Sequence, residues 1–346
     1  MKKKFSITGF ILAAALIILA FSLPQLRASF DSNQDQANSD KPVNNQIEHT
    51  IGLLQMMDHP ALDEIRQGIY DGLAERGYHD GENIEIIYQN GQGDQNNLKR
   101  IADNFVAQDV DYLVGIATPA AQALNNASGQ TIPVIGSAVS DPVGAGLLEN
   151  PENPGRPVTA IADHAPIKEQ IQLIQEFVPN LKKLGILYTS SEVNVRRNVA
   201  DAIAYCEDNG IDYEVKTISS TNELKPVAEQ LAQEVDAIYI PNDNTIAGAM
   251  PTLIAATNAA GVPTFPTADS MIAEGGVATV GINQYEYGLL TAKVIADLIE
   301  GANLNAYPVQ YNDKNDFYYN DESLKALGIK PPAGFTEKAI NVNEKE

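Results

Sequence analysis

The sequence predicts an α/β protein built from two doubly wound, parallel-sheet domains with a ligand cleft between them. Short apolar stretches alternate with amphipathic helical stretches along most of the chain, as in βαβ units. This alternation runs once before and once after the Pro- and Gly-rich stretch NPENPGRP, and each half has the size of one such domain. Polar residues also follow several predicted strands, at the edge where open α/β sheets bind ligands.

The first half contains four predicted strand–helix units. The strands are HTIGLLQMM, ENIEIIYQ, DYLVGIA and TIPVIGSAV, and the helices are PALDEIRQGIYDGLAERGY, NLKRIADNFVAQ, PAAQALNNA and DPVGAGLL. In the first helix Leu62, Ile65, Ile69 and Leu73 recur every three or four residues and form one apolar face. The third helix is predicted to begin at Thr118 as N-cap with Pro119 in the first helical position.

The second half repeats the pattern after the helix IKEQIQLIQEFV. Its predicted strands are KLGILYT, DYEVKTI, DAIYIPND, PTFPTA, VATVGIN and YPVQY. The helices between them are VRRNVADAIAYCEDNG, LKPVAEQLAQEV, TIAGAMPTLIAATNAAG and YGLLTAKVIADLIEG, and the segment KNDFYYNDESLKALG completes the fold. This order again predicts a parallel sheet flanked by helices.

Charge and the amino terminus indicate an exported protein that does not bind nucleic acid. The chain has 23 basic and 45 acidic side chains, a net charge of −22, which repels phosphates. Three lysines precede the apolar run of residues 5–23, so residues 1–28 are predicted to be a signal peptide or a membrane anchor. Residues 29–46 are predicted to be a disordered tether. The remainder is expected at the extracytoplasmic face of the membrane, tethered or released after cleavage.

Catalytic, metal and cofactor motifs are weak. Cys206 is the only cysteine and lies among apolar residues at helical spacing, as a buried, inert thiol would. His49, His59, His79 and His164 show no metal-ligand spacing. No nucleophile elbow or phosphate-binding loop occurs in the sequence. We therefore expect no enzyme activity, no metal and no cofactor.

Five predicted strand ends carry the candidate ligand-binding residues. These are Met56, His59, Thr118, Pro119, Ser137, Asp141, Ser190, Ser191, Glu192, Asn194, Asp243, Asn244 and Thr245. Hydroxyls, free helix amides and carboxylates together suit a zwitterion. Its carboxylate is expected on the amides at Thr118 and at residues 190–191, and its ammonium on Asp243, with Asp141 and Glu192 as the alternatives. Each acid could instead cap a helix.

These segments resemble the extracytoplasmic substrate-binding proteins of ABC transporters, in the branch associated with tryptophan and other aromatic amino acids. The resemblance lies in HPALDEIRQGIYDGLAERGY, IATPAAQAL, SAVSDPVGAGL, YTSSEVNV and IPNDNTIAGAMP, which keep their order and spacing. It implies the periplasmic-binding-protein type I fold, with residues 47–162 and 285–313 in one lobe and 163–284 and 314–346 in the other. It also implies a monomer without catalysis that delivers its ligand to a permease driven by a cytoplasmic ATPase. The family's lipid-anchor cysteine is missing, which favours an uncleaved anchor helix.

The resemblance predicts an aromatic amino acid as ligand, tryptophan first and tyrosine or phenylalanine next. Leu54, Met56 and Met57 could line an apolar slot or belong to the core. Lobe closure on binding is expected, with hinges near residues 160–163, 283–285 and 311–314. Two other functions stay open. An extracytoplasmic sensor domain would use the same fold but is expected to carry a signalling module, and an α/β enzyme would need a catalytic group.

Overall fold

The computed structural model describes residues 47–281, 283–312 and 314–344. The predicted export segment (1–28) and tether (29–46) lie outside these residues. Within the described part of the chain, no helix combines the length and the hydrophobicity that are needed to cross a membrane.

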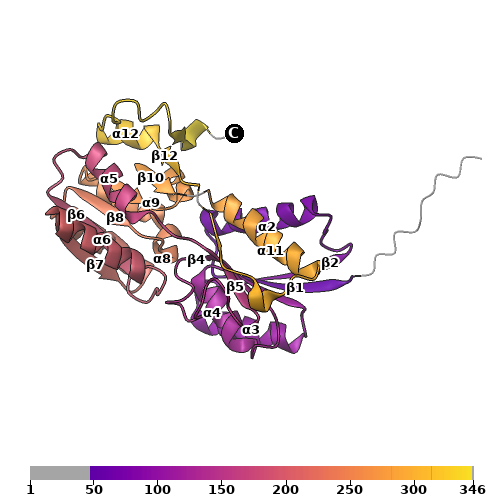
Figure 1. The fold of residues 1–346 in the computed structure, drawn as a ribbon. Coiled ribbons are helices and arrows are strands. Elements are labelled where there is room, and N and C mark those ends of the chain that lie inside the picture. Colours follow the sequence, from indigo (N-terminus) through magenta and orange to yellow (C-terminus); the bar gives the residue numbers. More distant parts are fainter. Residues whose placement is uncertain (1–46, 282, 313, 345–346) are drawn as a thin grey trace, which may run out of the picture. The chain divides into compact units, whose positions relative to one another are not determined.

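The first sheet has six strands, all paired in parallel (Figure 1). In spatial order they are β11 (Gln310–Tyr311), β5 (Val158–Ala162), β4 (Val134–Val139), β3 (Tyr112–Ile116), β1 (His49–Gln55) and β2 (Ile84–Asn90). Helices α2 (Pro60–Glu75) and α11 (Gln284–Ile299) cover one face, and α3 (Gln95–Ala107) and α4 (Thr118–Ala127) cover the other. The carboxyl ends of these strands therefore meet at one edge.

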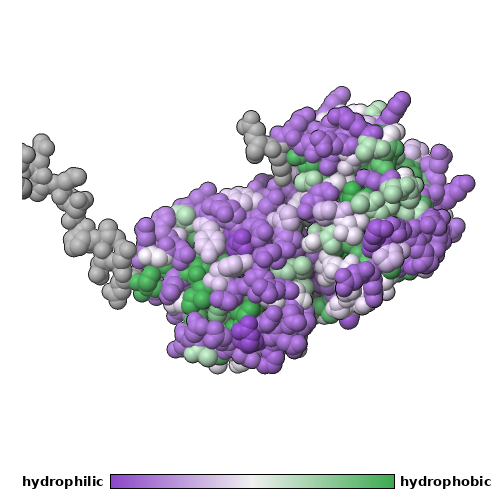
Figure 2. Space-filling model, turned by 180° about the vertical axis from the view of Figure 1, so that it is seen from behind, coloured by the Kyte–Doolittle hydropathy of each residue, from purple (hydrophilic) through white to green (hydrophobic). Residues whose placement is uncertain are grey.

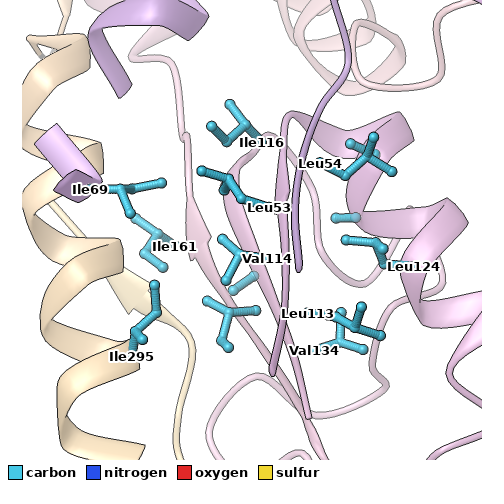
Figure 3. Close-up of a cluster of buried hydrophobic side chains, with 14 of the residues drawn as sticks. Leu53, Leu54, Ile69, Leu113, Val114, Ile116, Leu124, Val134, Ile161 and Ile295 are labelled. Carbon is cyan, nitrogen blue, oxygen red and sulfur yellow. The ribbon is translucent and has the colours of Figure 1, made fainter. Parts of the chain in front are cut away.

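The core of this region fills both faces of the sheet (Figure 3). Leu53 and Val114 point toward Ile69 of α2 and Ile295 of α11, whereas Leu54 on the opposite face points toward α4. All five side chains are at most 1% exposed. Burial of one such side chain contributes about 1.5–3 kcal/mol, so the two helix layers and the sheet form one rigid support for the strand ends.

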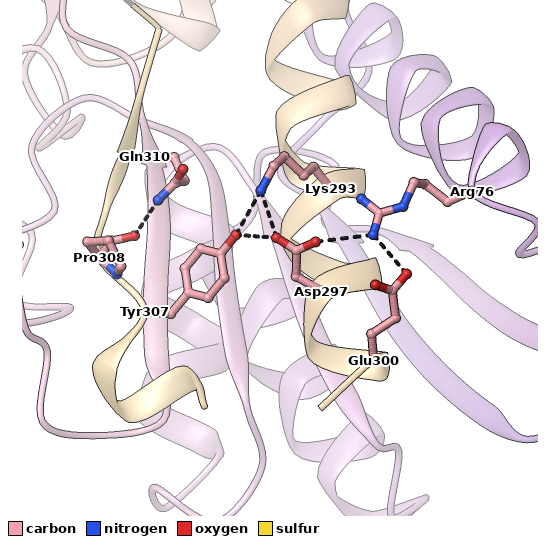
Figure 4. A network of polar contacts seen from close by, with 7 residues as sticks. All are labelled: Arg76, Lys293, Asp297, Glu300, Tyr307, Pro308 and Gln310. Atoms are coloured by element: carbon pink, nitrogen blue, oxygen red, sulfur yellow. Dashed lines mark hydrogen bonds and ion pairs between the residues drawn. The ribbon is translucent and has the colours of Figure 1, made fainter. Parts of the chain in front are cut away.

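Helices α2 and α11 approach each other backbone to backbone. A Cβ atom on Gly68 would lie 2.3 Å from the carbonyl oxygen of Tyr285, and one on Gly288 would lie 2.2 Å from that of Ile65. Only glycine fits at both positions. At the far end of the same pair, Arg76 of α2 donates to Asp297 and Glu300 of α11 at 3.2 and 2.8 Å (Figure 4). The two helices are thus joined along their length.

A second parallel sheet and a small mixed sheet form the rest of the fold. The parallel sheet contains β7 (Asp212–Ile218), β6 (Lys183–Thr189), β8 (Ala237–Ile240) and β9 (Thr264–Pro266). The mixed sheet contains β10 (Ala278–Gly281), β12 (Asp316–Tyr319) and β13 (Ile340–Asn341). The helices are α5 (Ile167–Phe177), α6 (Arg196–Asn209), α7 (Leu224–Leu231), α8 (Asn244–Ala247), α9 (Met250–Ala259), α10 (Asp269–Ala273) and α12 (Asp321–Leu327). Short 3₁₀ turns lie at Thr221–Glu223, Leu304–Ala306 and Val342–Glu344.

The order of the elements confirms the predicted α/β class. The chain leaves the six-stranded sheet after β5, rejoins it through α11 and β11, and leaves again to form β12. The exact lobe boundaries stay a prediction. The outer surface seen in Figure 2 is mostly hydrophilic, with small scattered apolar groups, in keeping with the high net charge of −22.

Two local predictions were wrong. The stretch DPVGAGLL forms turns and no helix, because the Asp141 carboxylate accepts from the amide of Gly144 and Gly146 takes a φ of +71°. Helix α4 begins one residue earlier than expected, with Ala117 as N-cap at a φ of +74° and Thr118 inside the first turn. The Thr118 hydroxyl is therefore released from capping.

Candidate ligand-binding site

A narrow cleft with about 40 Å³ of accessible space lies where the carboxyl ends of the two parallel sheets face each other. Its lining comes from both sheet regions and comprises His59, Ala61, Leu62, Ala117, Thr118, Ala138, Ser140, Asp163, Asn194, Asn242, Asp243, Asn244, Ala247, Ala268, Met271 and Gln284. A mainly apolar cleft with a few polar groups is typical of small-molecule sites.

The wall contributed by the β3–α4 junction carries an unused hydrogen-bonding group. Thr118 is 2% exposed, and its Oγ1 has no hydrogen-bond partner among the described residues. The first amides of an α-helix have no partner within the helix and carry a partial positive charge. Ala117 precedes them with its φ of +74°, a conformation that costs free energy for a residue with a Cβ atom. This junction can receive an anion.

The adjoining end of β4 is also distorted. Ala138 has a φ of +52°, and the pairing of β4 with β5 shifts register between Gly136 and Val139. Such irregularities re-aim strand ends beside binding sites. This bulge could not be predicted from the residue pattern, because an alanine holds the positive φ where a glycine would be expected.

The facing junction, β8–α8, is already capped by two acids of the protein. Asp243 accepts hydrogen bonds from the amide of Ile246 and from both the amide and the hydroxyl of Thr189. Its pKa is raised by burial and by the nearby carboxylate of Glu192. Glu192 in turn accepts from the amides of Asn244 and Thr245 at 2.9 and 2.7 Å. The start of α8 thus has its negative partners.

Asp163, directly after β5, is the acid at the cavity that the sequence analysis did not select. It accepts a hydrogen bond from the Tyr287 hydroxyl at 2.8 Å and another from the side-chain amide of Asn242. Burial raises the pKa of this carboxyl to about 6. Neither partner is a cation, so Asp163 can accept a positively charged group. Its position at a predicted hinge was the one available signal.

His59 and Asn194 complete the polar part of the lining. His59 precedes α2, is 6% exposed and contacts the Asn244 side chain through Nε2 at 3.3 Å. Burial lowers its pKa, which favours the neutral ring. Neither His59 Nδ1 nor Asn194 Oδ1 has a hydrogen-bond partner in the described part of the chain. With Thr118 Oγ1, three buried polar atoms at one cavity lack partners, although such groups are usually satisfied.

The cavity brings together five of the thirteen predicted site residues: His59, Thr118, Asn194, Asp243 and Asn244. The others lie outside its lining, and they are Met56, Pro119, Ser137, Asp141, Ser190, Ser191, Glu192 and Thr245. Ser137 shares a hydrogen bond with Thr291 at 2.6 Å, and the Ser190 hydroxyl donates to the Ile218 carbonyl. Glu192 and Thr245 lie behind the lining, where they bond to each other. Their roles in binding stay predictions.

The described residues contain no group of three or more His, Cys, Asp or Glu side chains arranged to hold a metal ion. Cys206 is buried, and its pKa is raised to about 11 by desolvation, which disfavours the reactive thiolate.

Comparison with known proteins relates this chain to solute-binding proteins. Residues 50–343 match the family described as ABC transporter substrate binding protein. The tyrosine-binding protein of Clostridioides difficile (strain R20291) is 31% identical over 316 residues, which cover 91% of each chain. The lobes and sheets described above are those of the type I periplasmic-binding-protein fold.

Two solved structures differ in how closely they match. An ABC domain from Streptococcus pneumonia in complex with L-Trp is 39% identical, covers 84% of this chain and 98% of its own, and superposes with a TM-score of 0.81. The ligand-free, open structure of a substrate-binding protein with adhesive properties from Clostridium difficile is 34% identical. It covers 85% of this chain and 99% of its own, and it superposes with a TM-score of 0.67. The family match and the curated relative show that this chain belongs to the ABC transporter substrate-binding proteins.

Proposed function

We propose that this protein captures tryptophan or tyrosine in the cavity and delivers it to a membrane permease whose transport is driven by a cytoplasmic ATPase. The observation that carries the proposal is the set of three unpartnered polar atoms, on His59, Thr118 and Asn194, around one mainly apolar cavity. A polar, partly aromatic ligand would satisfy them. The relatives support the choice of ligand, because one is named as tyrosine-binding and another holds L-Trp.

In this proposal the ligand carboxylate lies at the start of α4. The Thr118 hydroxyl would donate to it, together with the free amides of the first turn. The start of α8 is a poorer place for an anion, because Asp243 and Glu192 already occupy its amides. A second carboxylate there would meet two like charges.

The ligand ammonium lies against Asp163. This replaces Asp243 as our preferred ammonium partner, since Asp243 already accepts three hydrogen bonds, two from Thr189 and one from Ile246. Asp163 accepts only from two neutral donors, Tyr287 and Asn242, and has lone pairs left for a cation. The ring would lie along the apolar wall that Leu62 and Met271 provide.

The lobes are proposed to close over the ligand. A contact between the two predicted lobes, His59 with Asn244, supports a closed arrangement here. The better superposition on the L-Trp complex than on the open, ligand-free relative agrees with it. Small-angle scattering should give a smaller radius of gyration at saturating ligand, and an unchanged profile would argue for a rigid site.

Calorimetry of the purified protein against the twenty amino acids tests the function. Heat of binding is expected with tryptophan, tyrosine or both. Indole-3-propionate, which lacks the ammonium, should bind much more weakly, because Asp163 would be left buried without its partner. Binding of a sugar or a branched-chain amino acid, with no heat from any aromatic amino acid, would refute the proposal.

A further inference from the structure

A chain of hydrogen bonds behind the cavity fixes which nitrogen of His59 carries the proton. It starts at Glu192, whose carboxylate accepts from Asn194 Nδ2, from Asn244 Nδ2 and from the Thr245 hydroxyl at 2.8, 3.0 and 2.7 Å. Two backbone amides add to these donors. The Glu192 oxygens act as acceptors in all of these contacts, so each neighbour turns a hydrogen toward them.

The side-chain amide of Asn244 is therefore held in one orientation. Its Nδ2 faces Glu192, so its Oδ1 faces the other way, toward His59 Nε2 at 3.3 Å. A carbonyl oxygen cannot donate, and the contact forms a hydrogen bond only if Nε2 carries the hydrogen. In the neutral ring, which burial favours, Nδ1 is then a bare acceptor.

This acceptor is buried and unused. His59 is 6% exposed and lines the cavity, and Nδ1 has no partner among the residues that the structure describes. An unsatisfied buried acceptor destabilises the ligand-free protein, because it has lost its hydrogen bond to water. A ligand that donates a hydrogen bond at this point would recover that free energy, and a ligand that cannot donate would leave the cost in place.

The position of His59 indicates which donor it meets. Ala61 and Leu62 follow it in the first turn of α2 and form part of the apolar wall, whereas the ammonium is assigned to Asp163, on the segment after β5. We propose that His59 Nδ1 accepts a hydrogen bond from the N–H or O–H of the ligand's aromatic ring. His59 would then be the residue that selects tryptophan and tyrosine over phenylalanine. This inference rests on the proposed function.

Calorimetry with ring analogues tests it. Tryptophan or tyrosine should bind the wild-type protein at least about tenfold more tightly than phenylalanine and 4-fluorophenylalanine, which keep the ring but lack the donor. In His59→Phe this preference should fall to within about threefold, because the donor-bearing ligand loses affinity and phenylalanine does not. His79→Phe, the same change at an exposed loop outside the cavity, should keep the wild-type preference.

The outcomes are distinct. Equal binding of phenylalanine and the preferred ligand by the wild-type protein overturns the inference and leaves the proposed function intact. An equal loss for all ligands in His59→Phe also overturns it, since His59 would then hold the ammonium that they share. If no aromatic amino acid binds, the proposed function fails and the inference with it.

A spectroscopic measurement tests the origin of the selectivity independently of affinity. The ¹⁵N shifts of the His59 ring should show hydrogen on Nε2 and a lone pair on Nδ1 in the ligand-free protein, and the Nδ1 shift should move when tyrosine or tryptophan binds. Hydrogen on Nδ1 in the ligand-free protein would contradict the assignment.

Discussion

The two helix starts that face each other across the cavity, those of α4 and α8, have opposite chemistry. At α4, among the described residues, the Thr118 hydroxyl lacks a partner and no acid caps the first turn. At α8 Asp243 and Glu192 together cap the first turn. An anion from solution can therefore be bound at α4, whereas α8 has been neutralised by the chain itself. A helix start is a binding site only when the protein leaves it uncapped.

The largest expected effect is on stability, at the capped start of α8. Glu192→Ala should lower the free energy of unfolding by about 4 kcal/mol, because it leaves the donors of Asn194, Asn244 and Thr245 buried without an acceptor. Urea denaturation measures this change. Glu192→Gln retains one acceptor oxygen and should lose less. A wild-type midpoint for Glu192→Ala would mean that solvent can replace the carboxylate.

The second largest effect is expected for Asp163, the acid that we assign to the ligand ammonium. Asp163→Asn should weaken binding of the preferred amino acid by roughly 2–5 kcal/mol, mainly through faster dissociation, because the ammonium loses its charged partner. Stopped-flow fluorescence or calorimetry measures the loss. Asp243→Asn is the matched comparison and should cost only about 1 kcal/mol of stability as a weakened cap. If the two variants exchange these effects, Asp243 holds the ammonium.

The pH dependence of binding should report the same acid. The pKa of Asp163 is raised to about 6 in the folded protein, above its usual 3.8, so the ligand-free form takes up a proton as the pH falls through 6. An ammonium needs the ionised form. Affinity should therefore be constant above pH 6 and fall up to tenfold per unit below it. Asp163→Asn should remove this dependence; a persistent dependence would assign it to another group.

The raised pKa of Asp163 changes the stability of the fold with pH in the opposite direction to ligand affinity. Its contribution to stability is fully present below pH 3.8 and is lost as the pH rises through 6. Calorimetric melts of the ligand-free protein and of Asp163→Asn across this range would reveal the contribution as their difference.

The smallest effect is expected at the uncapped start of α4. Thr118→Val removes a buried hydroxyl that bonds to no described residue, so the ligand-free protein should be as stable as wild type or more stable by up to about 1 kcal/mol. Ligand affinity should nevertheless fall by about tenfold. Thr118→Ser, which keeps the hydroxyl, is the control for affinity. A large loss of stability in Thr118→Val would mean that the hydroxyl is used within the protein.

Most strands could be predicted because each is a short apolar run that ends at polar or turn residues, but β5 (Val158–Ala162) was not among the predicted strands. β6 follows the predicted stretch KLGILYT residue for residue, since its apolar run ends at a polar junction. The site was harder to predict. Whether Thr118 or Asp243 is satisfied depends on partners that lie far away in sequence, such as Glu192 for the start of α8. Asp163 was missed because it and its partners, Tyr287 and Asn242, lie in three segments that only the fold brings together.

The glycine contact between α2 and α11 makes these two helices move as one rigid unit. At one end His59 and Gln284, at the helix starts, line the cavity; about 20 Å away along α11 lies the Arg76–Asp297 ion pair. Because Gly68 and Gly288 leave no space between the backbones, neither helix can slide past the other. A ligand that displaces the start of one helix must therefore displace the other helix as well. The end of the pair at Arg76 then moves together with the cavity end.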